Sequence, residues 1–449
     1  MSPRVYKAVA LFFLLVTVAG TNSLMAQELR SLTIQDAISL AKKNNLSVKT
    51  ALINLQLQEQ TNKAFTAQAL PSVSGTAGTT EFFQTPVTIV PGEFFGGAPG
   101  STIAVSFQPK YSASAGVQLN QTLFDGQVFV GLKARKVSID YYQKAVDLTV
   151  ESITVNVYKV YYQLVVSKTQ MKLIDANIER AEKLLKDTRA MYNNGFAEKL
   201  DVDKTTVQLA NLQTTRANTE TDIINGYLGL KYLIGIPSAD SVSLATDFNE
   251  DDLKQAIPLD SGYRYEDRFD YQGLQISKEL SEYDIKRYKA LYYPKLSITG
   301  AYQKNAYNNN YDFFTKSGNW YSTSYAGFSL SVPIFSGFEK NANLKKAKIQ
   351  ANLVENQIEN LKLNIDYEVK QARNNFFSAI GTMDNQRGNS ALAESVYDQT
   401  KKKFESGLAS NTDLNKAQTD LIEAQTNYIN ALYKVVIAKI DYLKAIGKI

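Results

Sequence analysis

The stretch FESGLASNTDLNKAQ, residues 404–418, places one glycine between two helix-like runs, and a related stretch occurs earlier in the chain. The earlier stretch is YNNGFAEKLDVDKTT, residues 192–206, and it aligns at an offset of 212 residues. The aligned pairs are Gly195 with Gly407, Ala197 with Ala409, Asp201 with Asp413, Lys204 with Lys416 and Leu209 with Leu421. A repeat that keeps its register in this way predicts a chain built from two related halves.

Composition excludes most enzyme chemistry. The 449 residues include no histidine and no cysteine, so His-based triads, thiol nucleophiles, the usual zinc sites and disulfides are ruled out. No glycine-rich phosphate loop followed by lysine occurs, and the formal net charge of +5 is too small to indicate nucleic-acid binding. We therefore expect no enzyme, no cofactor, no metal site and no nucleic-acid partner.

The first 26 residues have the three-part layout of a secretory signal peptide. Arg4 and Lys7 precede the apolar run AVALFFLLVTVAG, and small residues follow up to Ala26. A transmembrane anchor is the alternative, but the run is shorter than the roughly 20 apolar residues that cross a bilayer. Residues 1–26 are therefore predicted to be a signal peptide.

Two long tracts are predicted to be helical hairpins, residues 127–235 and 338–449. Neither the tract between Pro109 and Pro237 nor the tract after Pro333 contains proline, which most reliably stops a helix. A seven-residue apolar repeat typical of coiled coils runs through both tracts: Leu132, Ile139, Val146, Ile153 and Val160, then Leu344, Ala351, Ile358, Ile365, Ala372 and Ala379. At 1.5 Å per residue the first helix of each hairpin is on the order of 100 Å long.

Alternating apolar and polar residues predict four strands, at about 71–83, 109–124, 294–304 and 320–335. The segments between the paired strands, rich in glycine, proline, asparagine and aromatic residues, are predicted to be exposed hairpin loops. Alternation alone favours an ordinary sheet on a soluble core, but long helices leave no apolar surface to cover it. One set of polar side chains would then face a water-filled lumen: Ser112, Ser114, Gln118, Ser297 and Thr299.

Four strands after a secretion signal suggest part of an outer-membrane wall. Such a wall must close on itself, because unpaired backbone groups in lipid cost several kcal/mol each. The smallest barrels of this kind have about eight strands, so two or more chains must contribute. This arithmetic leaves a dimer and a trimer equally open.

With the repeat, the hairpins and the strands in this order, the chain resembles the TolC family of outer-membrane efflux channels over nearly all of its mature length. The resemblance implies a mixed α and β membrane protein, with a trimeric 12-stranded β-barrel continued by a long α-helical barrel across the periplasm. It divides the chain into repeats at 27–235 and 262–449, with an equatorial insertion at 236–261. The family's prolines at strand–helix junctions would correspond to Pro71, Pro294 and Pro333, while Thr122 occupies the fourth junction.

The resemblance also implies two sets of site residues. The helix tips would contact a periplasmic adaptor protein, and they comprise Gly195, Phe196, Ala197, Gly407, Leu408 and Ala409. The periplasmic gate would involve Asp201, Phe404, Asp413 and Lys416, although Phe404 lacks the hydroxyl of the family's gate tyrosine and Lys416 replaces a second aspartate. We expect Asp413 and Lys416, one helical turn apart, to neutralise each other in part. The plainer roles are glycine helix ends with positive φ and carboxylates at helix starts.

The sequence thus predicts an outer-membrane exit duct that passively conducts solutes delivered by an inner-membrane transporter and its adaptor. Its expected partners are two further copies of the chain, the adaptor, the transporter and outer-membrane lipid. The alternatives are a secreted coiled-coil protein of adhesin type and a periplasmic glycosidase with paired carboxylates. The acidic run NEDDL at Asn249–Leu253 is predicted to be a helix-start feature and not a metal site. The cargo and the type of pump stay open.

Overall fold

The computed structural model describes residues 30–245, 262–315 and 319–449. The signal peptide, Asn249–Leu253 and most of the 236–261 insertion lie outside these ranges. The described chain forms two compact units that interleave along the sequence. One unit contains residues up to Thr50 together with 147–268 and 364–449, and the other contains 51–146 and 269–363.

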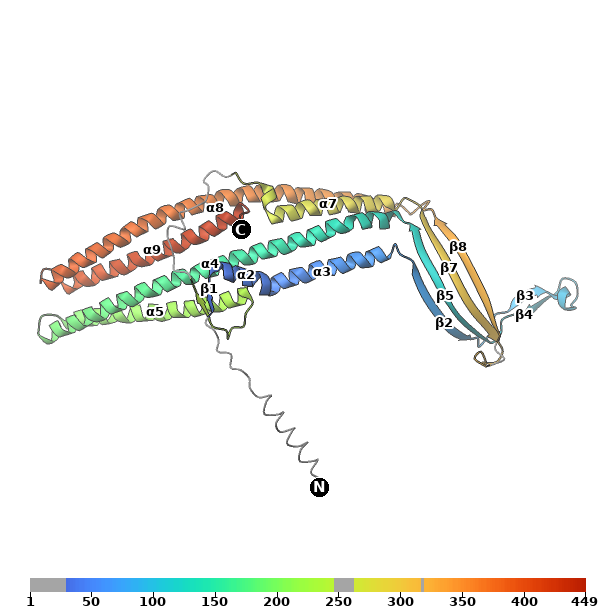
Figure 1. The fold of residues 1–449 in the computed structure, drawn as a ribbon, viewed down its shortest axis with the longest axis horizontal. Coiled ribbons are helices and arrows are strands. Elements are labelled where there is room, and N and C mark those ends of the chain that lie inside the picture. Colours follow the sequence, from blue (N-terminus) through green and yellow to red (C-terminus); the bar gives the residue numbers. More distant parts are fainter. Residues whose placement is uncertain (1–29, 246–261, 316–318) are drawn as a thin grey trace, which may run out of the picture. The chain divides into compact units, whose positions relative to one another are not determined.

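The second unit is built on a four-stranded antiparallel sheet with the order β2-β5-β7-β8 (Figure 1). The strands are β2 (Ser72–Glu81), β5 (Tyr111–Phe124), β7 (Lys295–Asn308) and β8 (Trp320–Ser331). The central pairing joins β5 of the first half of the chain to β7 of the second half. Because β2 and β8 are the outer strands, each has one edge that no other described strand covers.

The ladder register sorts the side chains of the sheet onto two faces. The apolar face carries Val73, Val117, Leu119, Leu296, Ile298, Tyr302, Phe328 and Leu330. The polar face carries Ser74, Thr76, Ser112, Ser114, Gln118, Asn120, Ser297, Thr299, Gln303, Thr323 and Ser329, and therefore brings together the residues expected to line a lumen. The apolar side chains are left in the open, with Phe328 74% and Leu330 65% exposed.

Prolines mark three of the four boundaries between helix and strand. Pro71 lies just before β2, Pro294 just before β7, and Pro333 between β8 and the helix α8 (Glu339–Glu405). At the fourth boundary, between β5 and the helix that follows it, the structure differs from the sequence prediction, which places the junction at Thr122. The strand continues to Phe124 through an irregularity in the β5–β7 register, because a threonine keeps the backbone N–H that a proline would lack.

In this unit, the two shorter helices that precede the strand pairs each contact a long helix. In α3 (Leu46–Ala67), the amide of Asn62 donates to the carbonyl of Arg135 in α4 (Gly126–Asn193) at 2.9 Å. In α7 (Phe269–Ala290), Lys278 forms an ion pair with Glu355 of α8 at 3.0 Å. Each contact ties the shorter helix that precedes a pair of strands to the long helix that follows the pair.

The first unit contains α5 (Lys199–Ile234) and α9 (Asn411–Ala445), together with the parts of α4 and α8 that pair with them in two helical hairpins. Its main apolar core packs α2 (Ile34–Asn44) against α4 and α5 around Tyr161, whose hydroxyl donates to the carbonyl of Leu32 at 3.1 Å. A short parallel pair joins β1 (Arg30–Leu32) to β6 (Val242–Leu244). Since β6 belongs to the expected insertion, the described part of that insertion is anchored to the first strand of the described chain. This unit also contains the short helix η2 (Tyr265–Asp267).

The buried seam of α8 departs from the seven-residue pattern predicted from the sequence. The pattern holds at Ile358 and Ile365, and the next buried side chains are Val369, Phe376 and Met383 in place of Ala372 and Ala379. The shift has a simple physical cause, since the larger side chains remove more apolar area from water than alanine can. The alanines instead line a groove described below.

In the described ranges, none of the helices carries an uncharged apolar stretch of the length that a bilayer crossing requires.

Candidate functional site

Both hairpins of the first unit end in the same kind of tight turn. Gly195 and Gly407 have φ of 81° and 72°, the left-handed region that glycine adopts without strain. In each turn the residue after the glycine donates its N–H back into the preceding helix, Phe196 to the carbonyl of Met191 and Leu408 to that of Lys403, both at 2.8 Å. These are Schellman-type ends, which satisfy the last carbonyls of a helix.

The turns present apolar side chains to solvent. Phe196 and Leu408 are each 80% exposed, whereas Ala197 and Ala409 are half-buried. A large apolar side chain held by an ordered turn and left in water is typical of a surface that binds another protein. The six residues expected at the tips therefore lie in two matching turns.

The start of α9 is fixed by a reciprocal capping box. The hydroxyl of Ser410 accepts the N–H of Asp413 at 3.1 Å, and the Asp413 carboxylate accepts the Ser410 N–H at 3.0 Å and its hydroxyl at 2.7 Å. These donors hold the pKa of Asp413 below its ordinary value of 3.8. In α5 the matching Asp201 lies at the same helical position and accepts the N–H of Glu198 at 3.4 Å.

This box predicts how the stability of the tip depends on pH. Because the folded-state pKa of Asp413 is depressed, its contribution is present above the ordinary value and is lost as pH falls through the folded pKa. Ser410→Ala is expected to cost about 1 kcal/mol at neutral pH, and the difference from the wild type should shrink below about pH 4. Hydrogen exchange of the first amides of α9 measures this, with Ser406→Ala as control because its hydroxyl bonds only within α8. A pH-independent difference contradicts the assignment.

Lys416 does not pair with Asp413, contrary to the expectation from the sequence. Its ammonium nitrogen lies 3.3 Å from the Asp420 carboxylate, one turn further along α9. The reason is that the Asp413 carboxylate is already held by Ser410, while Asp420 stands at the (i, i+4) spacing from Lys416. The negative charge of Asp413 is therefore not neutralised within its own chain by Lys416.

Phe404 lies inside the apolar cluster near the tips. It packs from α8 against a core made by Leu184, Tyr397, Leu414, Ala417 and Leu421, which come from α4, α8 and α9. The side chain is half-buried. Its contribution to this region is thus packing between helices, consistent with a phenylalanine that has no hydroxyl to donate.

Between the two hairpins, α9 presents a column of buried amide side chains at seven-residue spacing, Asn411, Gln418 and Gln425. Asn411 donates to the Thr188 hydroxyl at 2.8 Å, and Asn177 donates to Gln425 at 2.9 Å. Both amide atoms of Gln418 are buried without a hydrogen-bond partner in the described chain. A contact made of amides gains less from burial than an apolar one, so it separates at lower cost. The sequence carried this signal in the spacing 411, 418 and 425.

A second polar cluster joins the Tyr263–Arg268 segment to α8. Tyr263 and Tyr265 both donate their hydroxyls to one Asp366 oxygen, at 2.6 and 2.9 Å, which lowers the pKa of Asp366 and raises the pKa of Tyr263 to about 12. The side chain of Arg268 is 8% exposed and donates to Glu368 at 2.8 Å and to the carbonyl of Ala445 at 3.3 Å. These bonds hold the beginning of the second half against both α8 and the end of α9.

Glu368→Ala is expected to lower the free energy of unfolding by about 2 kcal/mol, because a hydrogen bond to a buried charge is lost. Lys278→Ala is the matched control, since the Lys278–Glu355 pair has similar geometry but exposed side chains and should change stability by less than about 1 kcal/mol. Thermal unfolding in detergent measures both variants. Equal losses of stability in the two variants would contradict the assignment, because they would show that the burial of Arg268 does not strengthen its bond to Glu368.

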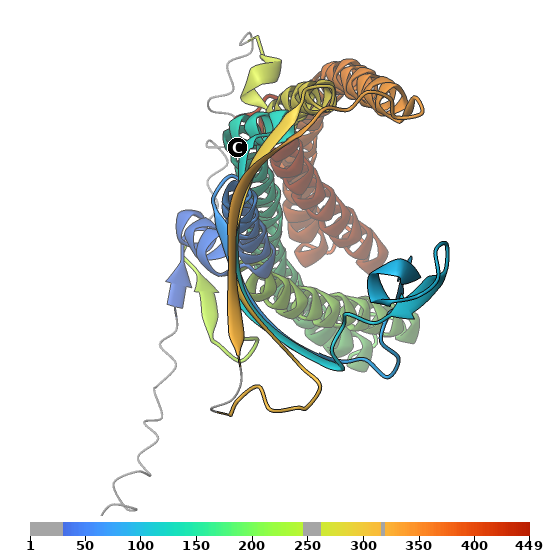
Figure 2. The ribbon, with the colours of Figure 1, turned by 90° about the vertical axis from the view of Figure 1, so that its right-hand side faces the viewer.

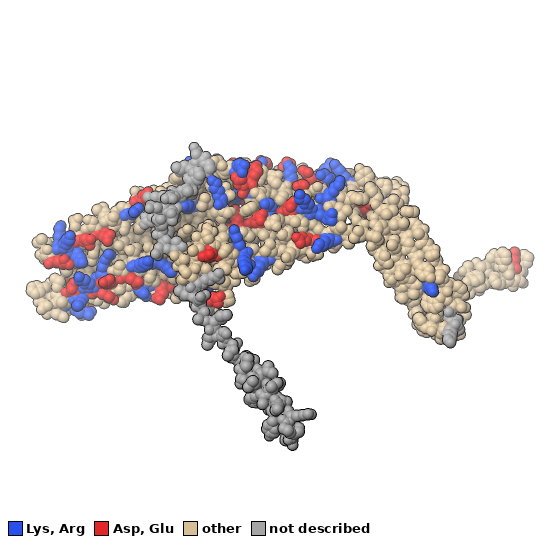
Figure 3. All heavy atoms as spheres, in the orientation of Figure 1, with Lys and Arg blue, Asp and Glu red and all other residues tan. Residues whose placement is uncertain are grey.

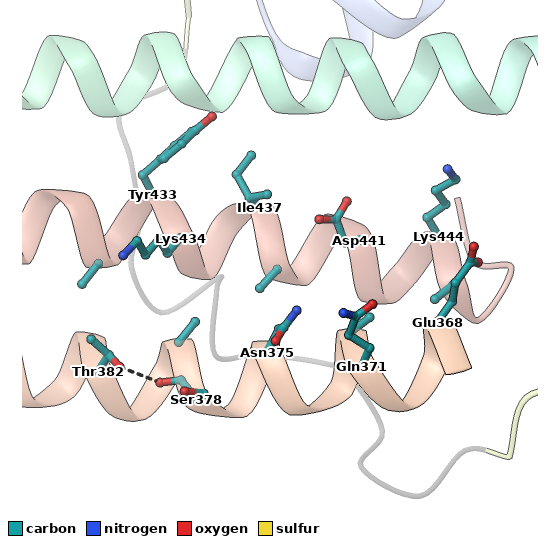
Figure 4. A pocket seen from close by; sticks show the side chains of 15 residues that line it. Glu368, Gln371, Asn375, Ser378, Thr382, Tyr433, Lys434, Ile437, Asp441 and Lys444 are labelled. Atoms are coloured by element: carbon teal, nitrogen blue, oxygen red, sulfur yellow. Dashed lines mark hydrogen bonds between the residues drawn. The ribbon is translucent and has the colours of Figure 1, made fainter. Parts of the chain in front are cut away.

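A groove of about 660 Å³ runs between α8 and α9 (Figure 4). Its floor includes the two displaced heptad alanines of α8, Ala372 and Ala379, and alanines of α9 at the same spacing, Ala431, Ala438 and Ala445. Gln371 and Asn375 point from α8 toward α9 (Figure 4). On α9, Asp441 forms an ion pair with Lys159 of α4 at 2.6 Å. Within the described residues, no three acidic side chains come together as a metal site.

Comparison with known proteins identifies the kind of molecule that has these features. A family model described as outer membrane efflux protein matches residues 37–236 and 266–448. The outer membrane protein TolC of Vibrio cholerae is 20% identical over 346 residues, covering 74% of this chain and 76% of its own length. The proteases secretion protein PrtF of Dickeya chrysanthemi is 20% identical over 273 residues, 60% of this chain and 58% of its own. The CmeC outer membrane channel of Campylobacter jejuni superposes with a TM-score of 0.74 at 17% identity, over 92% of this chain and 85% of that one.

Proposed function

Because this chain belongs to the outer membrane efflux protein family, it is a passive exit duct in the outer membrane and not an enzyme, and we propose that three copies build the duct. In this proposal each copy contributes four strands to one 12-stranded barrel. The hairpins of the three copies form an α-helical barrel in the periplasm. An adaptor and an inner-membrane transporter complete the path and supply the energy.

The observation that carries the proposal is a single sheet with two uncovered edges and an exposed apolar face. In hydrocarbon each unpaired backbone group costs several kcal/mol, so β2 of one copy must pair with β8 of the next. Two copies would give eight strands, and the interior of a barrel of about that size is filled by side chains. Twelve strands leave room for water, which favours three copies for a conduit.

The side chains support this orientation of the sheet. The apolar face would meet lipid, and the polar face would line the lumen. Near the end that carries Trp320, the apolar face includes Lys304, a position where a long cationic side chain can reach the membrane interface. Trp320 at the same end is a residue that membrane interfaces favour.

We extend the proposal to the two halves of the chain and to the ends of the helices. Residues 27–235 and 262–449 act as two repeats, 1–26 as a signal peptide that directs export, and 236–261 as part of a girdle. The turns at Gly195 and Gly407 bind the adaptor through Phe196 and Leu408, flanked by Ala197 and Ala409. The exposure of both apolar side chains supports this role.

The periplasmic gate in this proposal lies at the start of the return helices, where Asp201, Phe404, Asp413 and Lys416 would act. Three copies of Asp413 would form a ring of negative charge, supported by a carboxylate that Lys416 leaves uncompensated. Phe404 would hold the tips by packing. The amide column on α9 would allow one hairpin to separate from the other during opening, because it is a polar contact.

Cysteine pairs across the edge between neighbouring copies test the proposal. The chain has no cysteine, so every disulfide comes from the introduced residues. Thr76→Cys on the polar face of β2 is combined in separate variants with Thr323→Cys, Tyr325→Cys or Ser329→Cys on β8, and this series scans the register between copies. We expect one of these variants to give a reducible three-chain species on oxidation. Thr76→Cys with Ser322→Cys, on opposite faces, is the control, and equal crosslinking of all pairs, or of none, would contradict the barrel.

A further inference from the structure

Within the segment between β2 and β5, residues 82–109 form an exposed and almost uncharged arm. It contains the strands β3 (Thr88–Pro91) and β4 (Thr102–Val105) and the short helix η1 (Gly92–Phe95). Its exposed apolar side chains are Phe83, Val87, Ile89, Phe94, Phe95 and Phe107. Glu93 is its single charged residue, and Figure 3 shows the arm as uncharged apart from one acidic side chain. So much apolar surface on a water-exposed segment indicates a contact with another molecule.

The arm is an ordered structure. β3 and β4 pair from Thr88 with Val105 to Pro91 with Thr102. The Glu93 carboxylate accepts the Gly100 N–H at 2.8 Å, and the Gly92 N–H donates to the Ser101 carbonyl at 2.7 Å. Figure 2 shows the arm as a hairpin of its own, with its short helix at the end. An apolar surface held in this way can bind a partner without first losing much conformational entropy.

Charges at the base of the arm argue against lipid as its partner. Lys110 and Glu81, which flank the arm, form an ion pair at 3.2 Å, and the Tyr111 hydroxyl donates to Glu81 at 3.1 Å. A charged pair at this level belongs in water or among headgroups, since charges in hydrocarbon are costly. The arm begins beyond this pair, so it lies past the part of the sheet that would meet acyl chains.

The described part of the second loop at the same end of the sheet contacts its own chain through Phe313 and Tyr311, while Phe314 is left 79% exposed. Phe313 of the β7–β8 connection is buried against Ala113 and Ala306, and its carbonyl accepts the Trp320 indole N–H at 3.1 Å. Tyr311 packs edge-on against Tyr111 with ring centres 5.6 Å apart. Most of the apolar surface that lacks a partner at this end therefore belongs to the arm, and in a three-copy barrel the arm of another copy brings a matching surface to the same end.

We propose that the arms of neighbouring copies pack against one another across the mouth of the barrel and form an apolar constriction at the exit. This inference rests on the three-copy barrel proposed above. A 12-stranded barrel with strands about 4.8 Å apart and tilted by about 40° has a radius of roughly 12 Å. The ten residues from Phe82 to Pro91, which lead to the short helix, can span up to about 33 Å, so each arm is long enough to reach the barrel axis.

A single cysteine tests this contact. In Phe94→Cys each copy carries one thiol, so any disulfide must join two copies. Mild oxidation of outer membranes is expected to link most of the protein into two-chain species, with every third chain left over. Phe314→Cys in the β7–β8 loop is the matched control, because the two side chains are 82% and 79% exposed, and it is expected to give little linkage.

Two further measurements decide between partners. Replacing residues 83–107 by a short glycine-containing turn is expected to raise single-channel conductance while the three-chain crosslink between Thr76→Cys and β8 persists. Equal disulfide yield for Phe94→Cys and Phe314→Cys, with that crosslink intact, would overturn the arm contact and leave the barrel standing. Quenching of a fluorophore on Phe94→Cys by brominated lipid would assign the arm to the membrane and also overturn it. Loss of the β2–β8 crosslink in the cysteine variants alone would instead contradict the barrel.

Discussion

Lysine in place of Phe328 is expected to stop the protein from assembling in the outer membrane, whereas lysine at the next residue, Ser329, leaves assembly intact. Phe328 is 74% exposed on the apolar face and pairs with Ile298, while Ser329 is on the polar face opposite Ser297. A lysine facing lipid costs about 2–4 kcal/mol near the bilayer midplane. Every copy carries the change, so the free energy of inserting a three-copy barrel into the membrane becomes less favourable by roughly 6 kcal/mol or more on the same scale.

The measurement is the fraction of each variant recovered from outer membranes as an oligomer that withstands detergent. Phe328→Lys should fall severalfold, and Ser329→Lys should remain near the wild-type level. In a planar bilayer Ser329→Lys should also favour anions, since it would add a positive charge to the lumen. Equal losses for the two variants would show that the faces of the sheet do not separate lipid from water.

The second large effect is expected at the helix tips. Phe196→Asp combined with Leu408→Asp should abolish binding of the cognate adaptor, because two exposed apolar contacts are replaced by charges. Central apolar contacts in interfaces are often worth about 2 kcal/mol each, so each substitution corresponds to roughly a thirtyfold weaker affinity. Export by the assembled system should fall with it, while the barrel is unaffected.

A matched control separates the loss of apolar contact from the added charge. Ser406→Asp places one carboxylate in the same turn as Leu408 and removes no apolar side chain. Adaptor binding by this variant should stay within a few-fold of the wild type, measured by crosslinking and by the rate of export. If Ser406→Asp weakens binding as much as Leu408→Asp alone, the turn responds to charge and the apolar contact is not the determinant.

The sequence was most informative where a local rule decides the structure. Glycine between two helical runs predicts the positive φ of Gly195 and Gly407, and both have it. The alternation that starts at Tyr111 predicts a strand, and β5 covers Tyr111–Phe124. The pattern of a single strand does not give its neighbours across the sheet, and the pairing of β5 with β7 depends on residues nearly two hundred positions apart.

The sequence was least informative where several helices compete for one position. Ala372 and Ala379 fit a heptad, but Phe376 and Met383 fill the seam because they bury more surface. Spacing alone predicts an ion pair between Lys416 and Asp413. In the structure Asp413 accepts the hydroxyl of Ser410, and Lys416 pairs with Asp420. The arm is predicted to be an exposed hairpin loop, but no periodic pattern indicates the two short strands within it, which pair from Thr88 with Val105 to Pro91 with Thr102.

The most direct test of the whole account is the mass of the detergent-solubilised protein measured under native conditions. A conduit made by joining β2 of one copy to β8 of the next requires that the particle contain three chains and that it need detergent to remain dispersed. A protein that stays in solution without detergent as one chain, with its apolar sheet face covered by its own helices, would contradict the shared barrel and the duct built on it.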